Sequence, residues 1–195
     1  GKRQEYTGII LKSGQHLLDL INQVLELSKI ENENVEMNPV AIAPSKVLRE
    51  CVDMVWEEAK RRHIEIVDAT CECAAEARFM GDQVRVRQIL INLLSNAVKY
   101  NRPGGRVTVN CGERDGMIRM SVVDTGAGIP VHRRDEVFRP FHRLGREAGQ
   151  IEGSGIGLAL ARELVLRMHG RIGFESEEGQ GSTFWFELPK AGPED

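Results

Sequence analysis

Apolar residues recur at three- and four-residue steps over the first part of the chain, which predicts one amphipathic helix from about Glu5 to Glu31. Its apolar stripe consists of Ile10, Leu17, Leu20, Ile21, Val24 and Leu27. An isolated amphipathic helix is marginal in water, so the stripe needs a partner surface from another chain or from the following domain. Asn-rich sequence and Pro39 end the pattern and place a boundary near residues 32–40.

Two further helical patterns follow this boundary. The first opens at Pro44 and carries its apolar positions on one face: Val47, Leu48, Cys51, Val52, Val55 and Ala59. The second runs from Asp82, a good N-cap residue, to about Tyr100. The nearby segments "HIEIVDA" and "ARFMGD" are typical of short strands.

Alternating apolar residues dominate much of the remaining chain. The stretch "RVTVNCGERDGMIRMSVVD" contains two such runs joined by Asp115 and Gly116, a strong signal for a β-hairpin. A short helix near Arg133–Val137, a glycine-bearing loop and a helix from about Gly157 to His169 come next, and "RIGFES" and "STFWFEL" are expected to be closing strands. Helices interspersed with hairpin-joined strands predict an α+β fold, in which helices pack on one face of a mixed sheet.

Composition narrows the class of protein. The 195 residues, 41% of them hydrophobic and 28% charged, are typical of a globular domain with an appendage. A formal net charge of −3 gives no electrostatic reason to expect nucleic acid or an acidic membrane as a partner. We find no apolar run of membrane-spanning length and no signal-peptide pattern, and expect a cytoplasmic domain without membrane contact. The cysteines lack the paired spacing of a zinc site and are expected to be reduced thiols: Cys51, Cys71, Cys73 and Cys111.

Three short stretches carry candidate chemistry. "DTGAGIP" ends a predicted strand with the carboxylate of Asp124 and follows it with two glycines, a pattern that fits either a surface turn or a ligand-reading residue beside open backbone. In "INLLSNAVKYN", Asn92 and Asn96 lie four apart on one helical face among apolar residues, where their amides need partners. "GSGIGLALAR" places glycines ahead of a helix, which fits an anion site or a flexible turn.

In their order and spacing these stretches resemble the ATP-binding catalytic half of a two-component sensor histidine kinase. "INLLSNAVKYN" is similar to the family's N box, "DTGAGIP" to its G1 box, "FRPFHRL" to its F box and "GSGIGLALAR" to its G2 box. "GSTFWFELP" resembles the closing segment of the nucleotide pocket, and "LLDLINQVLELSKIE" the second helix of the dimerisation and phosphotransfer hairpin. The resemblance covers roughly Leu17 to the C-terminus.

The resemblance implies a Bergerat-type ATP-binding fold, a two-layer sandwich preceded by one long N-terminal helix. Its implied domains are the hairpin helix over 1–34, the ATP-binding kinase domain over 35–190 and a tail over 191–195. Its implied cofactors are ATP and Mg²⁺, and its implied partners are a response-regulator receiver domain and a second copy of the parent protein, joined through the hairpin.

The resemblance also implies residue roles. The Asp124 carboxylate would accept a hydrogen bond from the 6-amino group of adenine, and Asn96 would bind Mg²⁺ through its side-chain oxygen. Thr183 would add a hydroxyl near the base, and the segment from Phe138 to Gly157 would be a mobile lid from which Arg143 reaches the terminal phosphate. The full implied nucleotide-binding set is Asn92, Asn96, Lys99, Tyr100, Asp124, Gly126, Gly128, Ile129, Arg143, Gly153, Ser154, Gly155, Gly157, Leu158 and Thr183.

One residue separates kinases from ATPases within this resemblance. DNA gyrase, the ninety-kilodalton heat-shock chaperone and mismatch-repair proteins resemble one another in having a glutamate one turn before the metal asparagine, which activates water. Here that position is Asn92, which cannot act as a general base. Phosphotransfer is therefore expected rather than hydrolysis.

The phosphoacceptor segment of the family has no match in this chain. The five histidines are His16, His63, His132, His142 and His169, and none is followed by an acidic residue. His16 precedes two leucines within the second-helix match, so we interpret it as a structural histidine of that helix. The chain is expected to begin mid-hairpin and not to phosphorylate itself. A degenerate module that binds nucleotide or a partner without transferring phosphate is the alternative function.

Overall fold

The protein is described by a computed structural model that covers residues 2–31, 36–70, 77–142 and 154–192. The chain divides into two compact units, Gly1–Val35 and Glu36–Asp195. The described part of the first unit, residues 2–31, is the helix α1 (Lys2–Glu31), as its apolar periodicity predicts. Large apolar side chains of this helix are exposed, with Ile10 at 71%.

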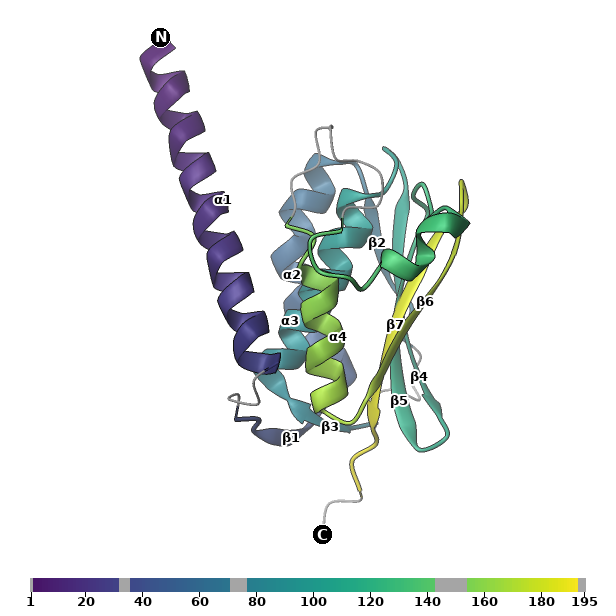
Figure 1. The fold of residues 1–195 in the computed structure, drawn as a ribbon. Helices are drawn as coiled ribbons and strands as arrows, with labels where there is room; N and C mark the ends of the chain where they lie inside the picture. Colours follow the sequence, from purple (N-terminus) through teal and green to yellow (C-terminus); the bar gives the residue numbers. More distant parts are fainter. Residues whose placement is uncertain (1, 32–35, 71–76, 143–153, 193–195) are drawn as a thin grey trace. The chain divides into compact units, whose positions relative to one another are not determined.

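In the second unit, the described residues pair a five-stranded sheet with three α-helices (Figure 1). Its strand order is β2 (Glu65–Asp68), β4 (Arg106–Arg114), β5 (Met117–Asp124), β7 (Gly181–Pro189) and β6 (Arg171–Glu177). β2 runs parallel to β4, and the other neighbouring strands pair antiparallel, so the sheet is mixed. The predicted α+β fold with helices on one face of a mixed sheet is confirmed.

The helices are α2 (Pro44–Arg61), α3 (Gln83–Lys99) and α4 (Gly157–Arg167), and all three lie on one face of the sheet (Figure 1). Local signals set their starts. Pro44 occupies the first turn of α2, and the Asp82 carboxylate caps α3 by accepting hydrogen bonds from the backbone amides of Val84 and Arg85. A 3₁₀ helix, η2 (Val131–Glu136), stands where a short helix is expected.

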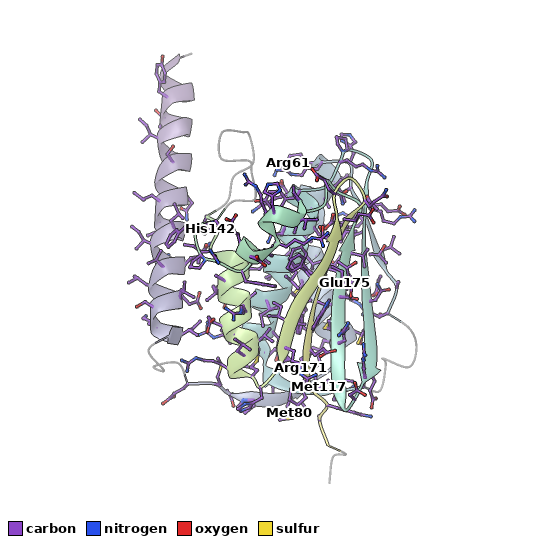
Figure 2. The ribbon with its side chains drawn as sticks, turned by 45° about the vertical axis from the view of Figure 1, so that its right-hand side comes forward. Arg61, Met80, Met117, His142, Arg171 and Glu175 are labelled. Carbon is purple, nitrogen blue, oxygen red and sulfur yellow. The ribbon has the colours of Figure 1, made fainter. Side chains whose placement is uncertain are left out.

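Strand alternation separates the two faces of the sheet. Along β5 the residues Ile118, Met120, Val122 and Asp124 are buried on the helix-covered face, while their neighbours in the strand are only half-buried on the open face. α3 supplies the opposing layer of the core through Val86, Ile89, Leu90, Leu93, Leu94, Ala97 and Val98. Figure 2 shows side chains filling the space between the helices and the sheet. The open face is therefore available to polar side chains.

Two strands lie outside the five-stranded sheet. β1 (Pro39–Ile42) pairs antiparallel with β3 (Phe79–Asp82), with Pro39 opposite Asp82. The sequence pattern did not predict β1. Only one of its four residues is buried, so the segment shows no alternation of buried and exposed positions that would indicate a strand. The pairing brings the chain back beside the start of α3.

Two cysteines belong to the described core. Cys51 and Cys111 are buried free thiols, and burial raises the pKa of Cys51 to about 12 and that of Cys111 to about 11. Both remain protonated at neutral pH and are poor nucleophiles. The structure agrees with the expectation of reduced thiols for these two residues.

Candidate functional site

Asp124 is a buried carboxylate at the end of β5. It is 7% exposed, and its Oδ1 accepts a hydrogen bond of 2.8 Å from the backbone amide of Gly126. Burial raises the pKa of Asp124, while hydrogen bonds from the backbone amides of Gly126 and Ser182 lower it in part. A carboxylate accepts about four hydrogen bonds, so Asp124 retains acceptor capacity for a ligand.

Gly126 is necessary because the end of α3 approaches the strand closely. A Cβ at this position would lie 2.4 Å from the carbonyl oxygen of Tyr100, the C-cap residue of α3. No side chain fits at that distance. Gly126 therefore brings the backbone of Tyr100 beside Asp124, which agrees with placing both residues at one site.

Gly128 joins the same loop to the hairpin between β6 and β7. Its φ is +67°, and a Cβ there would lie 2.0 Å from the carbonyl oxygen of Glu177. The backbone amide of Gly179 donates to the carbonyl of Ala127 at 2.7 Å, which closes the contact from the hairpin side. The loop after Asp124 is thus held against the hairpin by backbone interactions.

Two serines belong to this cluster and were not predicted from sequence. Ser182 lies opposite Asp124 in the β5–β7 register and is buried, and its Oγ lies 2.9 Å from Oγ of Ser176 on β6. The alternation of β7 could have identified Ser182, since it shares a face with Phe184 and Phe186. Ser176 offers no comparable signal in the sequence.

The predicted Thr183 is placed differently. It pairs with Val123 on one side and with Glu175 on the other, on the open face of the sheet (Glu175 is labelled in Figure 2). Adjacent residues of a strand point to opposite faces, so Thr183 faces away from the side on which Asp124 is buried. Ser182 therefore shares a face with Asp124, whereas Thr183 does not, and all three residues line one hollow.

A hollow of about 340 Å³ lies at this end of the sheet. Its lining comes from three strands and the turn between two of them: Val123, Asp124, Glu175, Ser176, Glu177, Gln180, Gly181, Ser182 and Thr183. α3 and α4 do not line it. The hollow is thus lined by strand residues that include Asp124 and Ser182, and its lining does not include Asn92 or Asn96.

The asparagines of α3 lie on the helix-covered side. The Asn92 side-chain amide donates to the carbonyl oxygen of Gly157 at 3.1 Å, so this residue ties the middle of α3 to the first residue of α4. Asn96 is half-buried, and within the described residues its side chain has no hydrogen-bond partner. Lys99 lies in the last turn of α3 and Leu158 in the first turn of α4. An oxygen donor such as the Asn96 side chain suits Mg²⁺.

The described ends of the predicted lid meet near the start of α4. The backbone amide of Phe141 donates to the carbonyl of Gly155 at 3.0 Å, and Ser154 Oγ accepts from the amide of Ile156 at 3.2 Å. Gly155 has φ +71° and packs against the backbone of Phe141. Arg143 and Gly153 lie outside the described residues, as does the segment 143–153 between these ends.

A metal site built from His, Cys, Asp and Glu is not found among the described residues, where such residues form no group of three or more. None of the helices in the described part is long and apolar enough to cross a membrane.

Comparisons with known proteins found a matching family model and several similar proteins. Residues 81–192 match the family model of the histidine kinase-, DNA gyrase B- and HSP90-like ATPases. The chain is 38% identical to the circadian input-output histidine kinase CikA of Thermosynechococcus vestitus over 96% of its own length and 26% of that protein. It is 34% identical to the sensor protein GacS of Pseudomonas syringae over 96% of its length and 21% of that protein. The chain thus spans about a quarter of the length of these relatives.

A solved structure extends the likeness to the fold. Full-length ShkA in complex with AMPPNP superposes with a TM-score of 0.86 at 32% identity, covering 100% of this chain and 40% of that one. The five-stranded mixed sheet, the helices on one face and the preceding long helix all fall within that coverage.

Proposed function

The chain belongs to the histidine kinase-, DNA gyrase B- and HSP90-like ATPase family, and from this premise we propose that it is the Mg·ATP-binding catalytic domain of a sensor histidine kinase. In its parent protein the domain would phosphorylate a histidine, and the phosphoryl group would then pass to an aspartate of a response-regulator receiver domain. The likeness to sensor histidine kinases along nearly the whole chain supports this assignment.

One observation carries the nucleotide assignment. Asp124 is a buried acceptor with unused capacity, beside a backbone that Gly126 and Gly128 hold in close contact with α3 and with the β6–β7 hairpin. An acceptor-only group matches the donating 6-amino group of adenine and disfavours the carbonyl of guanine. The neighbouring α3 then supplies the side chains for the phosphate end of the ligand.

The phosphate end is assigned to Asn92, Asn96 and Lys99. Asn96 would hold Mg²⁺ through its side-chain oxygen, and the ion would neutralise charge on the phosphate oxygens. Lys99 would add a positive charge, and Arg143 would reach the terminal phosphate. Asn92 would contribute at the start of α4, where its amide already contacts Gly157. In such a site catalysis consists of positioning and charge neutralisation.

The asparagine at position 92 favours transfer of the phosphoryl group over hydrolysis of ATP. Hydrolysis needs a group that takes a proton from water, and an asparagine amide is not a base. Transfer needs an imidazole nitrogen that attacks the γ-phosphorus in line as the bond to the β,γ-bridging oxygen breaks, with ADP as the leaving group and a neighbouring acidic residue to take the ring proton of the imidazole. None of the five histidines here is followed by an acidic residue, so we expect this chain to bind Mg·ATP without labelling itself.

Two measurements test the proposal. Calorimetric titration of the chain with ATP, with and without Mg²⁺, should show binding that magnesium strengthens; absence of binding would overturn the proposal. Addition of a hairpin fragment that carries an acceptor histidine, with γ-labelled ATP and alkaline quenching, should yield acid-labile phosphate on the fragment. Binding without transfer would instead favour the non-transferring regulatory module. Label on the chain alone that disappears in His16→Ala would contradict the interpretation of His16.

A further inference from the structure

The hydroxyl of Ser176 has three polar contacts that together use all of its hydrogen-bonding capacity. Its Oγ lies 2.8 Å from the backbone nitrogen of Ile129, 3.0 Å from the carbonyl oxygen of Gly181 and 2.9 Å from Oγ of Ser182. These partners come from the loop after Asp124 and from the first two residues of β7. Ser176 therefore ties β6 to this loop and to β7 at one point beside the candidate base site.

The chemistry of these partners determines where the hydrogens lie. A hydroxyl has one hydrogen to donate and two lone pairs that accept. The Ile129 amide can only donate, so Ser176 accepts from it. The Gly181 carbonyl can only accept, so the Ser176 hydroxyl donates its single hydrogen to Gly181. The contact between the two serines can then be made only if the Ser182 hydroxyl donates to Ser176.

The Ser182 hydroxyl is left with lone pairs alone to offer. Ser182 is buried opposite Asp124 across the β5–β7 pairing, and both residues line the same hollow. The ionised Asp124 side chain also offers lone pairs alone. The side chains of Asp124 and Ser182 thus offer acceptors and no donor.

We propose that Ser176 is a positioning residue for base specificity, because it holds the Ser182 hydroxyl as an acceptor beside Asp124 and so favours a purine with a 6-amino group over one with a 6-oxo group. This inference rests on the proposed nucleotide-binding function. Ser176 itself does not touch the base; it acts through the direction of the Ser182 hydrogen. Without Ser176, that hydrogen is free to turn toward a 6-oxo group.

Calorimetric titration with Mg·ATP and with Mg·ITP, whose base carries the 6-oxo group, tests the proposal. In Ser176→Ala the ratio of ATP affinity to ITP affinity should fall roughly three- to tenfold, the size of one hydrogen bond gained or lost. Ser176→Thr keeps the hydroxyl and should keep the ratio within about twofold. Ser121→Ala removes a serine from the open face of β5 and should leave both affinities unchanged.

The outcomes separate the roles that Ser176 can have. A loss of equal size for both nucleotides in Ser176→Ala would show a structural tie only and would overturn the inference. If that variant fails to fold, Ser182→Ala tests the acceptor role of the Ser182 hydroxyl, on which the inference depends. Loss of this acceptor should lower the affinity for ATP without lowering that for ITP. An equal loss for both nucleotides would overturn the inference there too. Failure of the unmodified chain to bind either nucleotide would overturn the proposed function instead.

Discussion

The side-chain amide nitrogen of Asn92 donates to the carbonyl oxygen of Gly157 across 3.1 Å, and the two residues lie 65 positions apart in the chain. A Cβ on Gly157 would lie 3.0 Å from Oδ1 of Asn92, so glycine permits the close approach of α4 to α3. The contact joins the asparagine-bearing helix to the glycine-rich start of the next one. Asn92 therefore has a structural partner within the chain, besides the phosphate contact proposed for it.

Substitution of Asn92 by aspartate should test this contact. The variant Asn92→Asp replaces the donating amide by a carboxylate that faces the Gly157 carbonyl, so we expect the free energy of unfolding to fall by about 1–3 kcal/mol. Urea unfolding measures this. Asn110→Asp makes the same exchange on the open face of β4 and should change stability by less than about 0.5 kcal/mol. If the free energy of unfolding of Asn92→Asp equals that of the parent, the contact contributes nothing to stability.

Substitution of Asp124 by asparagine should weaken nucleotide binding. In Asp124→Asn a charge-assisted hydrogen bond to the base is lost, and such bonds contribute on the order of 1.5–3 kcal/mol, so affinity for ATP should fall roughly ten- to more than a hundredfold. Asp115→Asn, at the exposed β4–β5 turn, is the matched control and should bind as the parent does. Affinity within threefold of the parent in Asp124→Asn would contradict the assignment.

As the pH is lowered, ATP affinity should begin to fall at a higher pH than the one at which an ordinary aspartate is protonated. Burial raises the pKa of Asp124, and protonation removes the charge that accepts the hydrogen bond from the base, so affinity should begin to fall above the range in which free aspartate titrates. The effect of acid on the free energy of unfolding has the opposite sign to its effect on ATP affinity. Because the folded pKa exceeds the unfolded one, this group destabilises the fold above its folded pKa, and the penalty is relieved as the pH falls through that value.

Titration of ATP affinity and of unfolding free energy between about pH 4 and pH 7 checks both directions. Asp124→Asn cannot titrate at this position, so the difference between parent and variant isolates the group from the ionisation of the phosphates. A parallel pH dependence of the two proteins would show that Asp124 is not the titrating residue.

Removal of Asn96 should act through magnesium. Asn96→Ala should weaken ATP binding mainly when Mg²⁺ is present and should leave the magnesium-free affinity much less changed, because the lost oxygen reaches the phosphates through the ion. Paired titrations in magnesium and in a chelator make the measurement. Equal losses under both conditions would indicate a structural role for Asn96.

A side chain at Gly128 should disrupt the loop that follows Asp124. In Gly128→Ala the Cβ meets the carbonyl of Glu177 and the residue must keep a positive φ, so we expect a loss of about 2 kcal/mol or more in unfolding free energy. Gly112→Ala is the control, since the space around Gly112 is open. Thermal unfolding of both variants gives the comparison, and equal stability would show that the loop yields without cost.

The sequence by itself determined the parts of this protein that depend on neighbours in the chain. The period of the apolar residues predicted α1 and α3, Asp82 was identified as a cap, and Asp115 with Gly116 as a turn. These succeed because helix starts, turns and buried faces are decided within a few residues. The position of Asp124 at a strand end before glycines was readable for the same reason.

The tertiary structure decided which of these parts meet. Ser182 rather than Thr183 shares a face with Asp124 because the β5–β7 register sets the pairing, and a shift of one residue would have exchanged them. β1 forms only by pairing with β3, and Asn92 contacts Gly157 only because α3 packs on α4. Ser176 acquires one of its three partners, the Ile129 amide, from a loop 47 positions away, and no local period records a contact between segments so far apart in the chain.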